Sequence, residues 1–475
     1  MSQTIDTIGN RLTPSVPLQI TYGSQALAVG RKFATLFAHM AASGGTGMPY
    51  QVYNVINVGD AASAQAEVDL VAGSGSQAGK MAAAFVKSNQ LSGNANFPAF
   101  RIVLLAFSDT NFGTSNVAFN GIMNLRSDLL VSCYPAENAA MLLQLENLAI
   151  TLSGPDRDLK GQFGSFVQLA SLAPLATQIA FDIDSQYVMV ESLPDSNTAL
   201  VEQAGVLTEA SNVITGLASA VGIYPGAQIS GTGVPAGALV GQVTSSTVTM
   251  VDSSGNALPA AASETSESIS FQNVVSQPPE LVAAAVAAGK LASVFPYVPL
   301  ANVVLGGIIP PQIASDIIDW NPSGESEAAL QAGLSPLTVD PAGDVVFIRT
   351  RTTYTTTPAN VTVTSYFDWQ QIVTLYDFRE VVYQLSQNPP FNNNPGGTLA
   401  SADVAAAFKD EVLREAYAFQ AQGAFQNVKP NATKFVVQVS SSGRFDFYIP
   451  CEVIPGLYVI AGNIQGVVSA SSFTI

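Results

Sequence analysis

Residues 101–106 read RIVLLA, an arginine followed by an unbroken apolar run. A run without polar alternation is typical of a strand that is buried on both faces of a parallel sheet. Strands that alternate with helices predict an α/β layer with both sheet faces covered. The neighbouring patterns predict further strands over 52–58, 128–134 and 178–182 and helices over 76–88 and 137–151.

The α/β pattern is interrupted once by a stretch of different composition. The α/β pattern covers residues 26–204 and resumes over 276–343, and we expect these two segments to form one core domain. Residues 205–275 between them contain no lysine or arginine and are rich in Gly, Ser, Thr and Val, with a turn signal at residues 254–256. This composition predicts a small inserted β domain of antiparallel strands.

Residues 344–455 predict a C-terminal α+β domain. A strand over 345–352 is followed by helical patterns over 368–385 and 402–421, the second capped by Ser401, with Asp410 placed to pair with Arg414. Two alternating strands, 434–440 and 444–451, flank a short loop that ends in glycine and therefore read as a hairpin. The fold class we predict is a multidomain α/β and α+β protein.

The two ends of the chain read as extended arms, residues 1–25 and 456–475. Apolar residues alternate with polar ones there, as in strands, but no partner strand is evident nearby. Strand edges without a partner favour pairing with another chain. The residues that we expect to mediate such intersubunit pairing are Leu18, Ile20, Tyr22, Leu457, Val459, Val467 and Phe473.

Composition narrows the classes of function. Apolar residues make up 48% of the chain and charged residues only 11%, so the surface is largely uncharged and suits extensive protein contacts. The net charge is −17, and residues 161–289 carry ten acids and no base, which disfavours nucleic-acid binding. We expect no membrane insertion and no signal peptide, hence free thiols at Cys133 and Cys451. A secreted adhesin-like β protein is an alternative, but it would need a leader.

Few motifs suggest chemistry. Residues 73–80, GSGSQAGK, lack the first glycine and the final hydroxyl of a P-loop, although Gly73 to Ala78 fit a loose dinucleotide fingerprint. We interpret this stretch as a helix-entry turn capped by Ser76, with a nucleotide-dependent enzyme as the weaker alternative. His39, the single histidine, reads as a packed or surface residue, and Asp182 and Asp184 as a solvated strand end. We expect no catalytic residue, no cofactor and no metal.

Several segments, in order, resemble the contractile-tail sheath proteins of bacteriophages, especially the Mu-like branch. They are GSGSQAGKMAAAFVKSN at 73–89, ANVVLGGIIPPQIASD at 301–316, AGLSPLTVDPAGDVVFIRTRTTYTT at 332–356 and SYFDWQQIVTLYDFREVVYQL at 365–385. No single one is diagnostic, and their order and spacing carry the resemblance. Residues 205–275 fall outside it, so nothing about their role carries over.

The resemblance implies a subunit that stacks as hexameric rings around a tail tube and contracts to drive the tube through a bacterial envelope. It implies contacts with baseplate and tail terminator proteins, assembly in the host cytoplasm and a place in the virion tail. It also implies that the terminal arms add strands to a neighbour's C-terminal domain. A phage-tail-like bacteriocin sheath is an alternative within the same family. From the charges of residues 349–455 we further predict that Lys409 and Arg414 face the tube.

Overall fold

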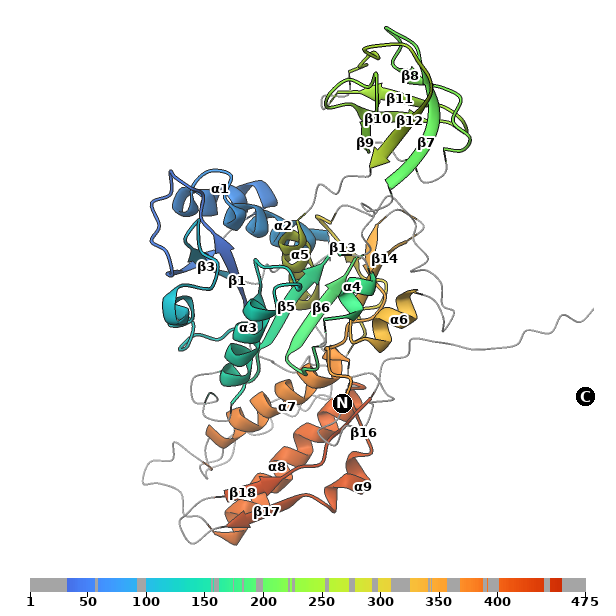
Figure 1. Cartoon of the computed structure of the whole chain (residues 1–475). Coiled ribbons are helices and arrows are strands. Elements are labelled where there is room, and N and C mark those ends of the chain that lie inside the picture. Colours follow the sequence, from blue (N-terminus) through green and yellow to red (C-terminus); the bar gives the residue numbers. More distant parts are fainter. Residues whose placement is uncertain are drawn as a thin grey trace, which may run out of the picture. The chain divides into compact units, whose positions relative to one another are not determined.

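The computed structural model describes two compact units, a larger one within Lys32–Val373 and a smaller one within Thr374–Ile454 (Figure 1). The predicted arms, residues 1–25 and 456–475, lie outside the described residues. The described residues are 32–55, 59–91, 100–154, 157, 162–173, 175–181, 183–193, 200–220, 223, 227–252, 256–272, 278–292, 298–308, 325–340, 342, 344–356, 368–387, 391, 401–439 and 445–454.

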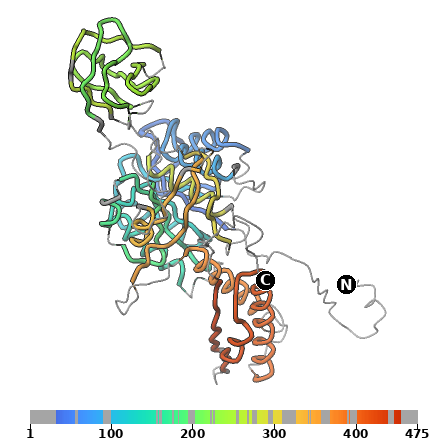
Figure 2. The backbone as a smooth tube through the Cα atoms, turned by 90° about the vertical axis from the view of Figure 1, so that its right-hand side faces the viewer, coloured from blue at the N-terminus to red at the C-terminus, as the bar shows by residue number. Residues whose placement is uncertain are grey.

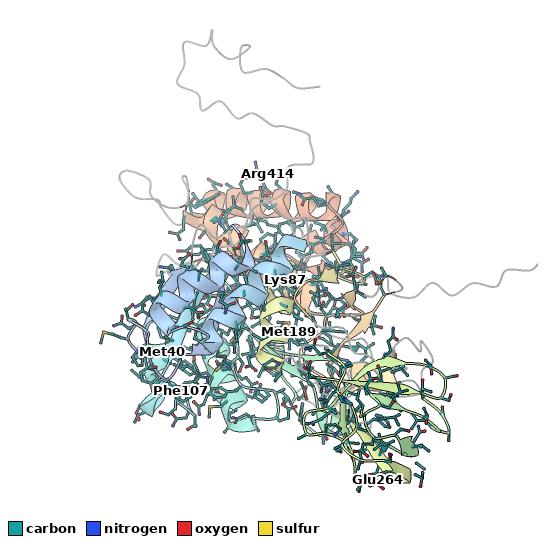
Figure 3. The ribbon with its side chains drawn as sticks, turned by 90° about the horizontal axis from the view of Figure 1, so that it is seen from above. Met40, Lys87, Phe107, Met189, Glu264 and Arg414 are labelled. Carbon is teal, nitrogen blue, oxygen red and sulfur yellow. The ribbon has the colours of Figure 1, made fainter. Side chains whose placement is uncertain are left out.

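A nine-stranded sheet forms the centre of the larger unit. The six strands from β14 to β3 run parallel, and antiparallel strands close both edges. The inner strands are almost wholly buried and mostly apolar, with a few buried polar side chains; Met189 of β6, labelled in Figure 3, is fully buried. In spatial order the strands are β13 (Val304–Leu305), β15 (Val345–Phe347), β14 (Ser335–Val339), β6 (Val188–Ser192), β5 (Phe166–Ser171), β4 (Leu129–Val131), β1 (Ala34–His39), β3 (Phe100–Leu105) and β2 (Val52–Val55).

Helices cover both faces of this sheet. The chain passes from β1 to β3 through α1 (Ala61–Ala72) and α2 (Gln77–Leu91), and from β4 to β5 through α3 (Ala139–Leu152). Because crossovers between parallel strands are right-handed and these two run in opposite directions along the sheet, α2 and α3 lie on opposite faces. Helix α5 (Pro279–Ala292) packs against α2 and against β5. The predicted α/β layer is confirmed, with the strand order reversing at β1.

The inserted segment forms its own β domain, whose chain course Figure 2 follows. Its six strands are ordered β7-β12-β9-β10-β11-β8, and a further bridge between Val206 and Thr215 joins β7 back to the chain beside β8. The sheet therefore closes into a barrel around its own apolar core. Its strands are β7 (Leu200–Leu207), β8 (Val213–Ile214), β9 (Gln228–Ser230), β10 (Leu239–Val243), β11 (Val248–Val251) and β12 (Glu264–Gln272), so the domain begins slightly before the predicted residue 205.

The smaller unit is built on two long helices. Helix α7 (Trp369–Gln387) enters it, and α8 (Ala402–Ala421) starts at Ser401, whose hydroxyl accepts the Val404 N–H as predicted. Phe419 of α8 stacks on Phe425, and both rings meet Phe378 of α7 edge-on. The remaining elements are β16 (Phe425–Gln426), α9 (Val428–Ala432), β17 (Val436–Val439), β18 (Phe445–Tyr448) and β19 (Glu452–Val453).

Two expectations about the fold differ from the structure. The strand predicted at 178–182 is wrong, because Leu175–Ile179 form the short helix α4; a short apolar run does not distinguish a strand from a buried helical turn. The domain boundary predicted at residue 344 falls inside the larger unit, since β15 pairs with β14 and β13 in the central sheet. The smaller unit begins later, at Thr374. Helix α6 (Glu325–Gln331) packs beside β14.

Candidate functional site

The glycine-rich turn at residues 73–80 connects α1 to α2, and several of its backbone donors are already bound within the chain. Gly73 and Gly75 have positive φ angles of 93° and 70°. The Asp69 carboxylate accepts the Gly75 N–H at 3.0 Å and the Ser76 hydroxyl at 2.8 Å. Ser76 Oγ in turn accepts the Gly79 N–H at 2.9 Å, which confirms the predicted cap. A phosphate would compete with the carboxylate of Asp69 here, so the geometry disfavours nucleotide binding.

At the carboxyl ends of β1, β3 and β4, where doubly wound sheets bind ligands, polar side chains fill the crevice. His39 ends β1, and its Nδ1 lies 2.7 Å from Gln77 Oε1 of α2. Its Nε2 lies 3.0 Å from the Asp109 carbonyl oxygen and 3.3 Å from the Tyr134 hydroxyl. The other end of the Gln77 amide donates to Glu280 Oε1 at the start of α5, at 2.8 Å. The network ties three strands and two helices together.

The carboxylate of Asp109 binds phenols rather than the imidazole. Tyr50 donates to its Oδ2 at 2.7 Å and Tyr134 to its Oδ1 at 3.0 Å. The hydrogen bond to Asp109 raises the pKa of Tyr50 to about 12, and burial raises that of Tyr134 further. Burial also holds the pKa of the Cys133 thiol well above its ordinary value. The raised pKa values favour the protonated forms of the two phenols and the thiol. In the part of the chain described, no activated nucleophile faces His39.

Asp184 lies before β6, and its carboxylate accepts hydrogen bonds from backbone N–H groups. Its Oδ1 accepts the N–H groups of Thr355 and Thr356 at 2.7 and 3.2 Å, while Asp182 lies outside the described residues. No three metal-ligating side chains gather among the residues that the structure describes. Nor does any described helix have the length and apolarity needed to cross a bilayer.

Helix α8 carries the two basic residues that the sequence predicts on a partner-facing surface. Lys409 is engaged internally: its Nζ donates to the Phe435 carbonyl oxygen at 2.8 Å and lies 5.5 Å from the centre of the Phe435 ring. Arg414 is 58% exposed, and it pairs with Glu411 at 2.7 Å and Glu415 at 3.0 Å. The predicted Asp410–Arg414 pair is therefore wrong, because closer carboxylates surround the guanidinium. Of the two, Arg414 is exposed, whereas Lys409 is half-buried and held by the Phe435 carbonyl oxygen.

The hairpin of β17 and β18 exposes one apolar pair on a face that it shares with the polar pair Gln438 and Asp446. Val436 and Tyr448 are directly paired across it and are 45% and 66% exposed, respectively. Phe447 points to the other face, where its ring lies 5.4 Å from that of Phe408 on α8. Within the described residues β17 and β18 pair only with each other, so each strand has a second edge. The alternation of residues 434–451 predicted this hairpin, but it did not reveal which apolar residues face solvent.

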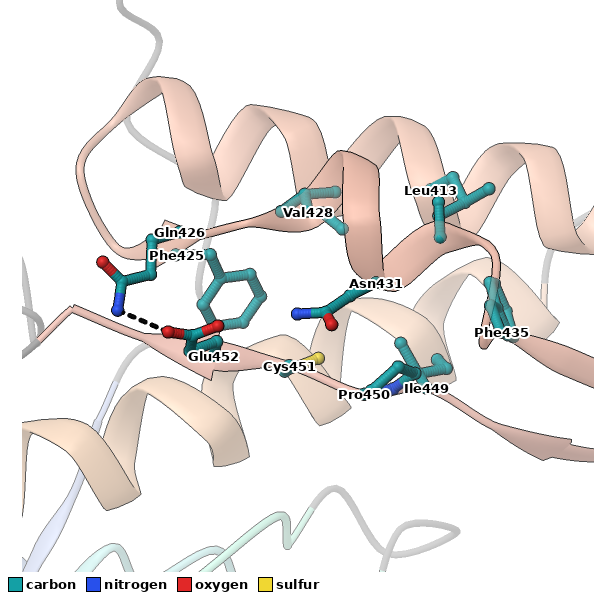
Figure 4. Close-up of a pocket in the computed structure, with 12 residues that line it drawn as sticks. Leu413, Phe425, Gln426, Val428, Asn431, Phe435, Ile449, Pro450, Cys451 and Glu452 are labelled. Carbon is teal, nitrogen blue, oxygen red and sulfur yellow. Dashed lines mark hydrogen bonds between the residues drawn. The ribbon is translucent and has the colours of Figure 1, made fainter.

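Behind the hairpin, the smaller unit closes on a small cavity of about 10 Å³ (Figure 4). Glu452 of β19 accepts from the side-chain amides of Gln426 at 2.7 Å and Asn427 at 3.0 Å. Cys451 lines the cavity, and burial raises the pKa of its thiol to about 11. The cavity has room for about one water molecule, so this unit offers no ligand pocket here.

Comparison with known proteins gives structural likeness only. No family model and no curated protein matches the chain. Among solved structures, a sheath tail protein from Desulfitobacterium hafniense is 11% identical, with a TM-score of 0.47 over 93% of this chain and 97% of that one. A sheath tail protein from Listeria innocua is 9% identical, with a TM-score of 0.49 over 89% and 92%. The contracted PVC sheath complex of an extracellular contractile injection system is 10% identical, with a TM-score of 0.49 over 97% and 99%. At these identities and TM-scores, function has to be argued from this chain's own residues.

Proposed function

We propose that the chain is a structural subunit of a contractile sheath, polymerised as stacked hexameric rings around a tube. The ordered sequence resemblance in residues 73–89, 301–316, 332–356 and 365–385 supports this function. The low charge content of the surface is consistent with it, since uncharged surfaces lose little on desolvation. The crevice at the carboxyl ends of the central strands is filled by the chain's own side chains, which gives no support to an enzymatic role.

The observation that carries the proposal is the two-stranded hairpin β17–β18, in which each strand has a second edge and Val436 and Tyr448 form an exposed apolar pair. A two-stranded hairpin is marginal by itself, and exposed strand edges bind further strands. We expect the arms 1–25 and 456–475 of neighbouring subunits to supply them. Each added backbone hydrogen bond contributes about 0.5–1.5 kcal/mol, so an arm that forms several bonds would hold two subunits together by several kcal/mol.

The partners follow from this role. The sheath would surround a tail tube and meet baseplate and tail terminator proteins at its ends, and the exposed Arg414 on α8 is the candidate for contact with acidic tube residues. Assembly would take place in the host cytoplasm, and the finished subunit would belong to the virion tail. The sheath of a phage-tail-like bacteriocin would use the same contacts, and the neighbouring genes distinguish the two. The Mu-like branch is the subgroup that the sequence resembles.

Truncation after Ile454 tests the proposal, because Ile454 is the last described residue of the smaller unit and the arm follows it. We expect the truncated chain to remain folded, with an unchanged far-ultraviolet spectrum, and to form no rings or tubes by electron microscopy. A chain with its 456–475 segment shuffled is the control for length and composition, and it should fail in the same way. Ordered tubes from the truncated chain would refute strand donation by this arm.

A further inference from the structure

Lys290 is buried in the centre of the larger unit. It is the single lysine or arginine between Lys160 and Arg349, and it lies on α5, where every residue from 282 to 288 is fully buried. The side chains of Lys290 and Glu191 have no exposed surface. A lysine side chain with no exposed surface adds nothing to solubility, so the contacts of its amine lie within the core.

The Lys290 amine meets two groups on adjacent strands. Its Nζ lies 2.7 Å from Oε1 of Gln168 on β5 and 2.5 Å from Oε1 of Glu191 on β6. The Gln168 amide lies against the Glu191 carboxyl, so the three side chains are in mutual contact. Gln168 is also fully buried, and its Nε2 donates to the Leu169 carbonyl oxygen at 2.9 Å. An amine, an amide carbonyl and a carboxyl are thus held together away from solvent.

Burial shifts both members of the pair toward their uncharged forms. It lowers the pKa of Lys290 and raises that of Glu191, because neither charge is solvated in an apolar core, and this outweighs the mutual attraction of the two charges. Glu191 Oε2 has no hydrogen-bond partner among the described residues, which would be costly for a full carboxylate. The Trp369 ring lies 5.5 Å from the amine and Met189 Sδ lies 3.2 Å from it. A neutral amine is a nucleophile, and a protonated carboxyl is a general acid.

We propose that Lys290 and Gln168 form an intramolecular isopeptide bond, with Glu191 as the proton relay. Lys290 Nζ attacks Cδ of Gln168, forming the new C–N bond. The bond from Cδ to Nε2 then breaks. Glu191, protonated at the start, gives its proton to the leaving nitrogen and takes one from the attacking nitrogen, so it ends unchanged while one ammonia is released. The reaction needs no oxidant or cofactor, and contact within the folded core replaces the activation that a free lysine and glutamine would need.

The product would tie α5 covalently to β5, on the face of the sheet where α5 also packs against α2. The link would close the chain between residues 168 and 290, including the whole inserted barrel, into one covalent loop. The isopeptide link does not depend on the proposed sheath function, and an experiment that refutes either proposal does not refute the other. It would limit how far the core opens under load or heat, since a closed loop restricts the unfolded chain.

Mass spectrometry of the folded full-length chain tests this directly. The intact mass should fall below the sequence mass by one ammonia. Trypsin leaves Gln168 and Lys290 in one peptide whether or not they are linked, because residues 161–289 contain no lysine or arginine. A protease that cuts after acidic residues is therefore required, and it should yield one linked pair of peptides containing Gln168 and Lys290. Full sequence mass, with the two residues in separate peptides, would overturn the proposal.

Two variants identify the mechanism. Lys290→Met keeps an unbranched apolar side chain of similar length, and it should restore the full sequence mass. Glu191→Gln keeps the shape of the relay and removes its acid, and it should also give the unlinked chain. If the link persists in Glu191→Gln, the relay role of Glu191 is wrong. The intact mass of the unaltered chain decides the central claim even if neither variant folds.

Discussion

Tyr448→Ser should weaken self-assembly while leaving the isolated chain folded and nearly as stable. Tyr448 is 66% exposed on the outer face of the β17–β18 hairpin, opposite Val436. In the isolated chain, the mutation removes few contacts, and surface substitutions of this kind usually change stability by less than about 0.5 kcal/mol. In the assembly, we expect a neighbour's arm to cover this ring.

The size of the effect follows from the exposed area. A tyrosine side chain buries about 200 Å² when fully covered, so about 130 Å² of Tyr448 is free for a partner. At about 25 cal/mol per Å², its burial contributes about 3 kcal/mol. Ordering the side chain costs about 1 kcal/mol of this, which leaves about 2 kcal/mol per contact. Since 1.4 kcal/mol is tenfold, the association constant should fall about 30-fold per contact.

Sedimentation velocity over a concentration series measures the assembly, and thermal unfolding of the dilute chain measures the fold. Tyr417→Ser is the matched control, because it makes the same exchange at an exposed position of α8 outside the hairpin. The control should assemble at the same concentration as the unaltered chain. If Tyr448→Ser assembles as readily as the control, the hairpin face is not an intersubunit contact, and no neighbouring arm covers Tyr448.

Four further outcomes are expected. Replacing Leu200–Gln272 by a short Gly-Ser bridge removes the closed barrel whole and should leave tubes intact by electron microscopy; monomers instead would place the barrel in the lattice. Arg414→Glu should weaken co-sedimentation with the tube at low salt while rings still form, and unchanged binding would remove α8 from that contact. Ser401→Ala should lower the free energy of unfolding by about 1 kcal/mol in denaturant titration, through loss of the α8 cap; no change would mean that solvent satisfies the Val404 N–H equally well. Cys451, with a pKa of about 11 instead of 9.0, should have about a hundredfold smaller thiolate fraction at pH 8 than an ordinary thiol. Its alkylation should be correspondingly slow until the smaller unit unfolds, whereas fast labelling of the folded chain would contradict its burial.

The same pKa sets the direction of a pH effect. The folded state raises the pKa of Cys451 from 9.0 to about 11, so it binds this proton more tightly than the unfolded chain does. The resulting stabilisation is complete below pH 9 and is lost as the pH rises from 9 to about 11. Tyr50, raised to about 12 by Asp109, acts in the same sense at higher pH in the larger unit.

Sequence patterns predict an element correctly where the interaction that forms it joins residues close together in the chain. Ser401 is predictable as a cap because a cap needs only its own hydroxyl and an N–H three residues on. Period and turn residues alone predict the strand at 101–106 and the hairpin at 434–451. The error at 178–182 arose in the same way: five residues contain too little periodicity to separate α4 from a strand.

The residues alone are enough to predict the α/β core, most of its helices and strands, the acidic inserted domain and the sparse charge that argues against nucleic acid. They do not reveal that β15 joins the central sheet, that the insert closes into a barrel through Val206 and Thr215, or that Lys290 meets Gln168 and Glu191; these contacts are visible only in the folded chain. These contacts join residues far apart in the chain. Periodicity and capping report on neighbours within a few residues, whereas strand order and side-chain contact across a core depend on which packing of all the elements buries the most apolar surface.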